Sequence, residues 1–218
     1  ISEGFKRILK TIDGEKLKPE REMAGDLGIA VGTLRQALKE LTSKGLLDRV
    51  QGSGNYIQAK ADPASVYAML RIELATGGGL PTAKVLDVVR LEKDTSLPAF
   101  GTSPFGFRIR RLRFLSGVVA AVEEIWLDGH FAKEILASEL SESLYLFYRQ
   151  KLGLWIARAQ DSVGQGPLPD WAPQDFPHQP QTPLPLITRI SWDANGQSVE
   201  LSKTWYDPTN VRYVARLK

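Results

Sequence analysis

The sequence of 218 residues contains no cysteine and only two histidines, His130 and His178. The lack of cysteine excludes disulfides, thiolate catalysis and zinc ribbons, and two histidines do not support a histidine-rich metal site. No apolar run approaches the roughly 18 residues needed to cross a bilayer, and residues 1–10 lack the apolar segment of a signal peptide. We therefore expect a soluble, cytoplasmic protein with no metal, no cofactor and no membrane partner.

Charge of one sign is also scarce, since the formal net charge is only +3. Residues 1–58 hold ten Lys and Arg against eight Asp and Glu. Such a balance is equally typical of an ordinary solvated surface, so total charge does not identify a protein that binds nucleic acid. Any contact with DNA must come from the placement of the charges.

The N-terminal part of the chain has the apolar spacing of three helices. The first carries Phe5, Leu9 and Ile12 on one face, the second covers about 19–27, and the third covers about 31–44. A glycine follows each of the last two helices and supplies the stop signal. A chain of this length exceeds one domain of about 100–150 residues, so we expect a second domain after them.

The pattern then changes to short extended runs at 46–50 and 55–58, separated by the glycine-rich segment 51–54. This arrangement predicts a hairpin, the wing of a winged helix-turn-helix. We therefore expect a DNA-binding domain at residues 1–58. A linker is expected at 59–82, where prolines and three consecutive glycines interrupt regular structure.

Residues 83–218 are predicted to form a mostly antiparallel α+β domain. The expected strands cover residues 85–91, 107–115, 118–127, 154–163, 186–193, 199–206 and 211–217. Ser116-Gly117 and Asn195-Gly196 predict tight turns between neighbouring strands. One helix is expected at 141–152 and a shorter one at 131–136.

Proline is concentrated at residues 167–185, with seven prolines in nineteen positions. This segment cannot be regular throughout and is interpreted as a partly ordered surface loop. Trp171 and Phe176 within it admit two interpretations, a lid over a pocket or anchors that hold the loop against the core. The anchor interpretation is preferred.

Several motifs of the N-terminal region occur in a fixed order. They are residues 16–24 (KLKPEREMA), 27–29 (LGI), 32–38 (GTLRQAL), 45–47 (GLL) and 51–54 (QGSG). Together they resemble the GntR family of repressors, and the resemblance covers nearly all of residues 1–58. It implies contacts with operator DNA by Arg21, Gly32, Thr33, Arg35 and Gly52.

The third helix is the recognition helix in this resemblance. Small residues at its start let the backbone approach base edges in the major groove. Gln36 and Lys39 on its exposed face are further candidates for contact with DNA. The family commonly has an arginine before the glycine and threonine, and here Ala30 and Val31 precede Gly32, so a favoured reader of guanine is missing.

Two of the candidate arginines also have a purely structural interpretation. Arg21 is placed to form an ion pair with Glu20 or Asp26. Arg35 is placed to pair with Glu40 or another neighbour within the domain.

The C-terminal region is similar to the UTRA domain, the effector-binding module of the HutC branch of the same family. The matching segments are residues 111–113 (RLR), 122–127 (VEEIWL), 143–145 (SLY), 153–154 (GL), 199–202 (VELS) and 212–213 (RY). The resemblance implies a sheet shared with chorismate lyase and a ligand pocket between sheet and helices. It also implies a homodimer formed largely by this domain.

The residue types in these segments suit an anionic ligand. Arg111 and Arg113 are two residues apart on one strand face, so both can bind one anion. Ser143 and Tyr145 lie where a helix begins, which also favours anions. Three further candidates, on two other strands, are Glu123, Glu200 and Tyr206.

Each of these candidates has an alternative that requires no ligand. Arg111 with Glu123 or Glu124 is placed to form a cross-strand ion pair, and Tyr145 is equally placed to be a core residue.

We predict a transcription regulator, a repressor, that binds duplex operator DNA as a homodimer. Its ligand is expected to be a small anionic metabolite such as a phosphosugar or a carboxylate. The alternatives are a lyase-like enzyme that uses Glu123 and Glu200 as acid and base, or a ligand-binding protein without DNA. No Ser/His/Asp set, metal-ligand cluster or phosphate loop accompanies the two carboxylates, so an enzyme is not expected.

Overall fold

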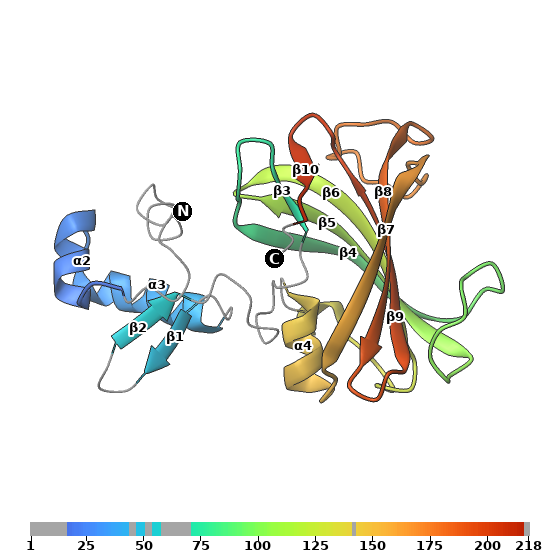
Figure 1. The fold of residues 1–218 in the computed structure, drawn as a ribbon, viewed down its shortest axis with the longest axis horizontal. Coiled ribbons are helices and arrows are strands. Elements are labelled where there is room, and N and C mark those ends of the chain that lie inside the picture. The colour runs from blue at the N-terminus through green and yellow to red at the C-terminus, as the bar shows by residue number, and fades with distance from the viewer. Residues whose placement is uncertain (1–16, 44–46, 51–53, 58–70, 141–142, 216–218) are drawn as a thin grey trace. The chain divides into compact units, whose positions relative to one another are not determined.

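The computed structural model describes residues 17–43, 47–50, 54–57, 71–140 and 143–215. The chain divides into two compact units, Ile1–Met69 and Leu70–Lys218 (Figure 1). Each unit is described by itself.

The N-terminal unit consists of helices α2 (Glu20–Leu27) and α3 (Val31–Ser43) followed by strands β1 (Leu47–Val50) and β2 (Gly54–Ile57). Helix α2 ends at Gly28, whose φ of 65° lies in the left-handed region that glycine adopts without strain. The two helices bury their apolar faces on each other, with Leu17, Met23, Ala24, Leu34 and Leu38 as the core.

Strands β1 and β2 pair antiparallel from Leu47 opposite Ile57 to Val50 opposite Gly54. The predicted hairpin after the third helix is therefore confirmed. The tip of this hairpin and the first predicted helix lie outside the described residues.

The C-terminal unit is built on a six-stranded antiparallel sheet with the order β4-β5-β6-β9-β8-β7. Its strands are β4 (Pro81–Glu92), β5 (Phe105–Leu115), β6 (Val118–Asp128), β7 (Ile156–Pro167), β8 (Pro183–Asp193) and β9 (Ser198–Tyr206). The predicted turns at Ser116-Gly117 and Asn195-Gly196 join β5 to β6 and β8 to β9. Positive φ angles of 50° at Ser116, 84° at Gly117 and 79° at Gly196 form these turns.

One face of the sheet is covered by helix α4 (Leu144–Lys151) and by the pair of short strands β3 (Ile72–Leu74) and β10 (Val211–Tyr213) (Figure 1). Helix α4 packs on β5 and β6 through Leu144, Phe147 and Tyr148. Strands β3 and β10 pack on a separate apolar cluster with Ile187 and Tyr206 of the sheet. Strand β3 lies within residues 59–82, the segment expected to be a linker.

The opposite face is covered by the proline-rich segment between β7 and β8. Leu168 and Phe176 of this segment are buried against Leu112, Val122 and Trp205 of the sheet, and Trp171 packs at the edge of the same cluster. The segment is thus pinned to the core, as the anchor interpretation predicts.

The short helix predicted at 131–136 does not form, and a 3-10 turn, η1 (Ala137–Glu139), follows that segment instead. Ile135 is buried in the core, whereas Leu136 is exposed and has an extended backbone with ψ of 140°. Phe131 and Ala132 pack against the same core but are only partly buried. A segment of six residues is too short to be stable as a helix by itself. The last strand, β10, is shorter than predicted and ends at Tyr213.

The anchoring of the proline-rich segment predicts a large loss of stability from Phe176→Ala. Phe176 is 3% exposed, and truncating a buried phenylalanine costs about 3–5 kcal/mol. The exposed Leu136→Ala is the control and should change stability by less than about 0.5 kcal/mol. Urea unfolding monitored by tryptophan fluorescence measures both, and equal small effects would show that the segment is a detachable lid.

Candidate functional site

The register of the sheet brings the predicted strand residues to the face that carries α4. Arg111 and Arg113 alternate with Leu112 and so share a face, and Arg111 lies directly opposite Glu123. Glu200 pairs with Leu127, four residues beyond Glu123 on the same face, and Tyr206 pairs with Ala121. Three neighbouring strands therefore present Arg111, Arg113, Glu123, Glu200 and Tyr206 on one side of the sheet.

Arg111, Arg113 and Glu123 form a buried cluster, the arginine–glutamate centre. Arg111 Nη2 donates to Glu123 Oε2 at 2.7 Å and Arg111 Nε donates to the same oxygen at 3.1 Å. Arg113 Nη1 reaches that oxygen at 3.5 Å. Burial raises the pKa of Glu123, but the charges of Arg113 and Arg111 outweigh it, so the pKa lies below its usual value. The predicted cross-strand ion pair between Arg111 and Glu123 is confirmed, and the two arginines hold the Glu123 carboxylate in its ionised form.

A second cluster surrounds Glu200 and is called the Glu200 centre. Three hydroxyl groups contact this carboxylate: Tyr148 Oη at 2.7 Å, Ser191 Oγ at 2.9 Å and Tyr145 Oη at 3.1 Å. Glu200 is only 2% exposed. Burial raises its pKa, and the hydrogen bonds from the hydroxyl groups offset this only in part. The environment of Glu200 thus favours the protonated form more than water does.

The two centres lie close enough to interact electrostatically. Burial and the charge of Glu200 raise the pKa of Tyr148, and the charge of Arg111 acts in the opposite direction. The charge of Arg189 likewise opposes the rise in the pKa of Tyr145. Arg189 donates from Nε to Asp161 Oδ1 at 2.6 Å and from Nη2 to Asp161 Oδ2 at 2.7 Å. The arrangement is a continuous buried polar layer between the sheet and α4.

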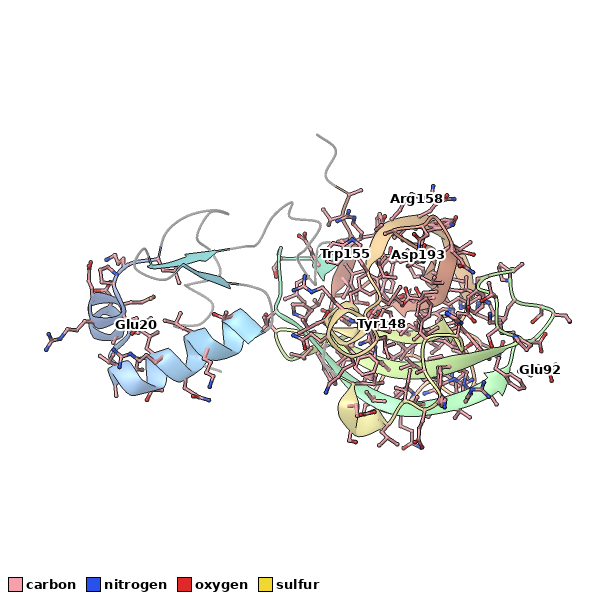
Figure 2. The ribbon with its side chains drawn as sticks, turned by 90° about the horizontal axis from the view of Figure 1, so that it is seen from below. Glu20, Glu92, Tyr148, Trp155, Arg158 and Asp193 are labelled. Atoms are coloured by element: carbon pink, nitrogen blue, oxygen red, sulfur yellow. The ribbon has the colours of Figure 1, made fainter. Side chains whose placement is uncertain are left out.

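Helix α4 positions its own residues in this layer. Ser143 is the N-cap residue, is buried, and its hydroxyl accepts a hydrogen bond from the Leu146 N–H at 3.4 Å. Tyr145 and Tyr148 are three residues apart on the helix, so both side chains reach Glu200. Tyr148 lies on α4 where the helix covers the sheet (Figure 2).

Sequence reasoning missed Tyr148, Ser191 and Arg189 as members of this layer. A signal existed for Arg189 and Ser191, because two polar residues spaced by two within an apolar strand share one face. Tyr148 had a signal only in its helical spacing from Tyr145. The strand order that brings β8 beside β9 could not be obtained from this spacing.

In the N-terminal unit, α3 exposes the predicted recognition surface. Leu34 and Leu38 are buried, whereas Gly32, Thr33, Arg35, Gln36 and Lys39 are exposed. Arg35 Nε donates to Glu20 Oε2 at 2.6 Å, so this arginine has a partner within the unit, although its side chain stays 65% exposed. Arg21 is exposed and forms no ion pair with the part of the chain that the structure describes. Gly52 lies outside the described residues.

Gly32 has no packing reason to be a glycine. A Cβ placed on it would meet none of the described atoms within 4 Å, and its φ is not positive. Glycine in a helix costs about 1 kcal/mol relative to alanine, so the fold alone favours a larger residue here. The open space above Gly32 belongs to the exposed surface of α3.

Neither a membrane span nor a metal site is found among the described residues. None of their helices is long and apolar enough to cross a bilayer. No group of three or more potential metal ligands comes together in the described ranges.

Comparison with known proteins gives matches over both units. Residues 10–57 match the bacterial regulatory proteins of the gntR family, and residues 77–212 match the UTRA domain. The HTH-type transcriptional regulator SmoD of Agrobacterium fabrum is 57% identical over 209 residues, which cover 96% of this chain and 89% of that protein.

Two more distant matches were also found. The histidine utilization repressor of Pseudomonas putida is 23% identical over 145 residues, 62% of this chain and 58% of that protein. The crystal structure of PhnF from Mycobacterium smegmatis has a TM-score of 0.53 at 20% identity and covers 98% of this chain and 97% of that one. This last likeness shows a common fold.

The raised pKa of Glu200 predicts a pH-dependent difference between the natural protein and Glu200→Gln. Below the usual pKa of 4.5, Glu200 is protonated in the folded and the unfolded state and costs little. As pH rises through the folded-state pKa, ionisation in the buried site lowers the stability of the natural protein, whereas the glutamine stays neutral. The Tm advantage of Glu200→Gln should therefore grow from about pH 4.5 upward and then level off. A difference that is constant between pH 4.5 and pH 8 would contradict the assigned burial of this charge.

Proposed function

Because the chain belongs to the GntR family of bacterial regulators and carries the UTRA domain of its HutC branch, we propose that it is a repressor controlled by a small anionic metabolite. A transcription regulator of this family binds DNA through the N-terminal domain and a ligand through the UTRA domain. The observation that carries the choice of an anion is the arginine–glutamate centre. In it, two buried guanidinium groups lie on one face of β5.

The ligand site proposed here is the buried polar layer. Arg111 and Arg113 bind the anionic group, because guanidinium donors form charge-assisted hydrogen bonds with phosphate and carboxylate oxygens. Ser143 contributes a hydroxyl at the start of α4, where the helix dipole also favours negative charge. Glu123, Glu200, Tyr145 and Tyr206 contact hydroxyl or amine groups on the rest of the ligand, which makes phosphosugars and hydroxylated carboxylates the favoured class.

The DNA site proposed here is the exposed surface of α3 together with Arg21 and the wing. Thr33 and Gln36 face base edges in the major groove, and Arg35 and Lys39 contact phosphates. The ion pair of Arg35 with Glu20 occupies Nε, so the terminal nitrogens of the guanidinium are the groups that point to the DNA. Gly52 of the wing contacts the DNA backbone.

Repression requires the two sites to be coupled. A homodimer places two recognition helices at half-sites about one helical turn apart. The ligand favours an arrangement of the two UTRA domains in which the recognition helices no longer match these half-sites. We expect a coupling of about 1–3 kcal/mol, and the operator then lowers ligand affinity by the same factor. The name of one distant relative, the histidine utilization repressor, supports this direction of control.

An enzyme is the alternative function. Glu123 and Glu200 have opposite pKa shifts, as an acid–base pair would, but the relatives are regulators. Opposite shifts also follow from ordinary differences in charge environment.

Gly32→Ala tests the DNA site through opposite effects on stability and binding. The added Cβ should raise the stability of the N-terminal domain by about 0.5–1 kcal/mol, because alanine favours the helix and meets no neighbour. It should weaken operator binding at least tenfold, because the backbone no longer approaches the bases closely. Fluorescence anisotropy with a promoter duplex measures the affinity. Gly25→Ala in α2, with equally open space, is the control and should stabilise without weakening binding.

Arg113→Met tests the ligand site. Arg111 stays bound to Glu123 at 2.7 Å in this variant, so the carboxylate keeps a partner. A thermal-shift screen of phosphosugars and carboxylates first identifies the ligand of the natural protein, and calorimetry then compares the variants. Arg113→Met should lower ligand affinity at least thirtyfold and keep operator affinity. Arg110→Met, on the opposite face of β5 beside Glu124, should leave ligand affinity unchanged. Full affinity of Arg113→Met would place the anion elsewhere.

A further inference from the structure

The two edge strands of the six-stranded sheet differ in how they are protected against pairing. Strand β4 has a bulge between Val85 and Asp87, carries charged side chains along its length, and is contacted by η1. A bulge, charges and a covering segment are the usual devices that prevent an edge from adding another strand. Strand β7 at the other edge is paired with β8 alone among the described strands.

Most of β7 lacks these devices. Its bulge lies at the start, between Ile156 and Arg158, and residues 159–166 are paired with β8 without interruption. These eight residues (AQDSVGQG) include one charged side chain, Asp161, which Arg189 neutralises through two contacts. Val163 in the middle is 53% exposed, the highest value for a large apolar side chain in the described part of the chain.

We propose that β7 is the dimerisation edge and that it pairs antiparallel with β7 of a second copy around a two-fold axis at Val163. This inference rests on the proposed function only in requiring a symmetric dimer. The family resemblance implies a dimer formed largely by the C-terminal domain, but neither it nor the ligand site specifies which surface of that domain forms the interface.

A second copy fits this edge better than an unrelated partner. Two identical strands related by a two-fold axis run antiparallel, so the open edge is complementary to itself in direction. With Val163 opposite its own copy, Ala159 lies opposite Pro167, where the absence of an N–H ends the ladder. The pairing then covers 159–167 and joins the two sheets into one.

Side chains at the axis are compatible with close approach. Ser162 lies opposite Gly164 of the copy, and both are small. Val163 shares a sheet face with Ile187, its partner on β8, which packs in the apolar cluster with Ile72 and Val211. Two Val163 side chains at the axis therefore bury each other next to an existing apolar cluster.

The same register connects this edge to the ligand site. Arg111 pairs with Glu123, Glu123 with Thr204, Thr204 with Ile187, and Ile187 with Val163. These residues form one continuous row across the sheet. Since neighbouring strands lie about 4.8 Å apart, Glu123 is about 14 Å across the sheet from Val163, and about 17 Å from the proposed axis. A ligand that repacks this row acts directly on the strand at the dimer interface.

Cysteine cross-linking tests the register, because the natural sequence has no cysteine that would compete. Directly opposite residues of antiparallel strands have Cα atoms about 4.5–5.5 Å apart, within the range that a disulfide spans. Oxidised Val163→Cys should give a covalent dimer in most of the protein at low micromolar concentration. Val118→Cys and Val89→Cys, at other exposed positions, should stay uncross-linked. Cross-linking through Val89, on β4, or through neither edge would overturn the proposal.

A charge at the axis tests the energetics. Val163→Lys places two like charges opposite each other and should raise the dimer dissociation constant at least tenfold, whereas Val118→Lys should not. Light scattering over a dilution series measures the constant, and circular dichroism confirms that both variants fold. A natural protein that dimerises and binds its operator, with Val163→Lys unchanged, would refute the β7 edge and leave the proposed function intact. A monomeric natural protein that binds no promoter fragment would refute both.

Discussion

The burial of charge on one face of the sheet is the constraint on which the fold of the UTRA domain depends. Moving an ion out of water costs several kcal/mol, and the cost is offset only by a partner at close range. Arg111 and Glu123 meet this condition at 2.7 Å because β5 and β6 place them directly opposite each other. A register slip by one residue between β5 and β6 would put Arg111 and Glu123 on opposite faces, so the ion pair and the apolar pattern select the same strand pairing.

The antiparallel register also turns local contacts into rows that cross the whole sheet. The row that begins at Arg111 ends at Val163 on the β7 edge, and a second row on the same face, four residues further along β6, contains Glu200 and Ser191. Helix α4 closes the second row through Tyr145 and Tyr148. The proposed ligand site and the proposed dimer edge are therefore parts of one packed layer, which provides a physical path for coupling between them.

The sequence predicted the helices and strands better than the contacts between distant segments. Alternation of apolar residues and the Ser116-Gly117 and Asn195-Gly196 turns were sufficient for the central strands, because these signals are local. The contact of Tyr148 with Glu200 joins residues 52 positions apart and depends on where α4 docks. The helix expected at 131–136 shows the same limit, since Phe131, Ala132 and Ile135 pack against a core formed by distant segments of the chain. The ion pair of Arg35 was foreseen in kind, but its partner Glu20 is set by the packing of α2 on α3.

The opposite pKa shifts of the two glutamates give them different roles toward a ligand. Glu123 is held ionised by two arginines and can only accept hydrogen bonds, which suits hydroxyl or amine donors. Three hydroxyl groups contact the carboxylate of Glu200, and burial keeps its pKa above the usual value. An anion bound beside Arg111 adds negative charge near Glu200 and disfavours its ionised form further. The proposed anion should therefore raise the pKa of Glu200 further, whereas the two arginines keep Glu123 ionised.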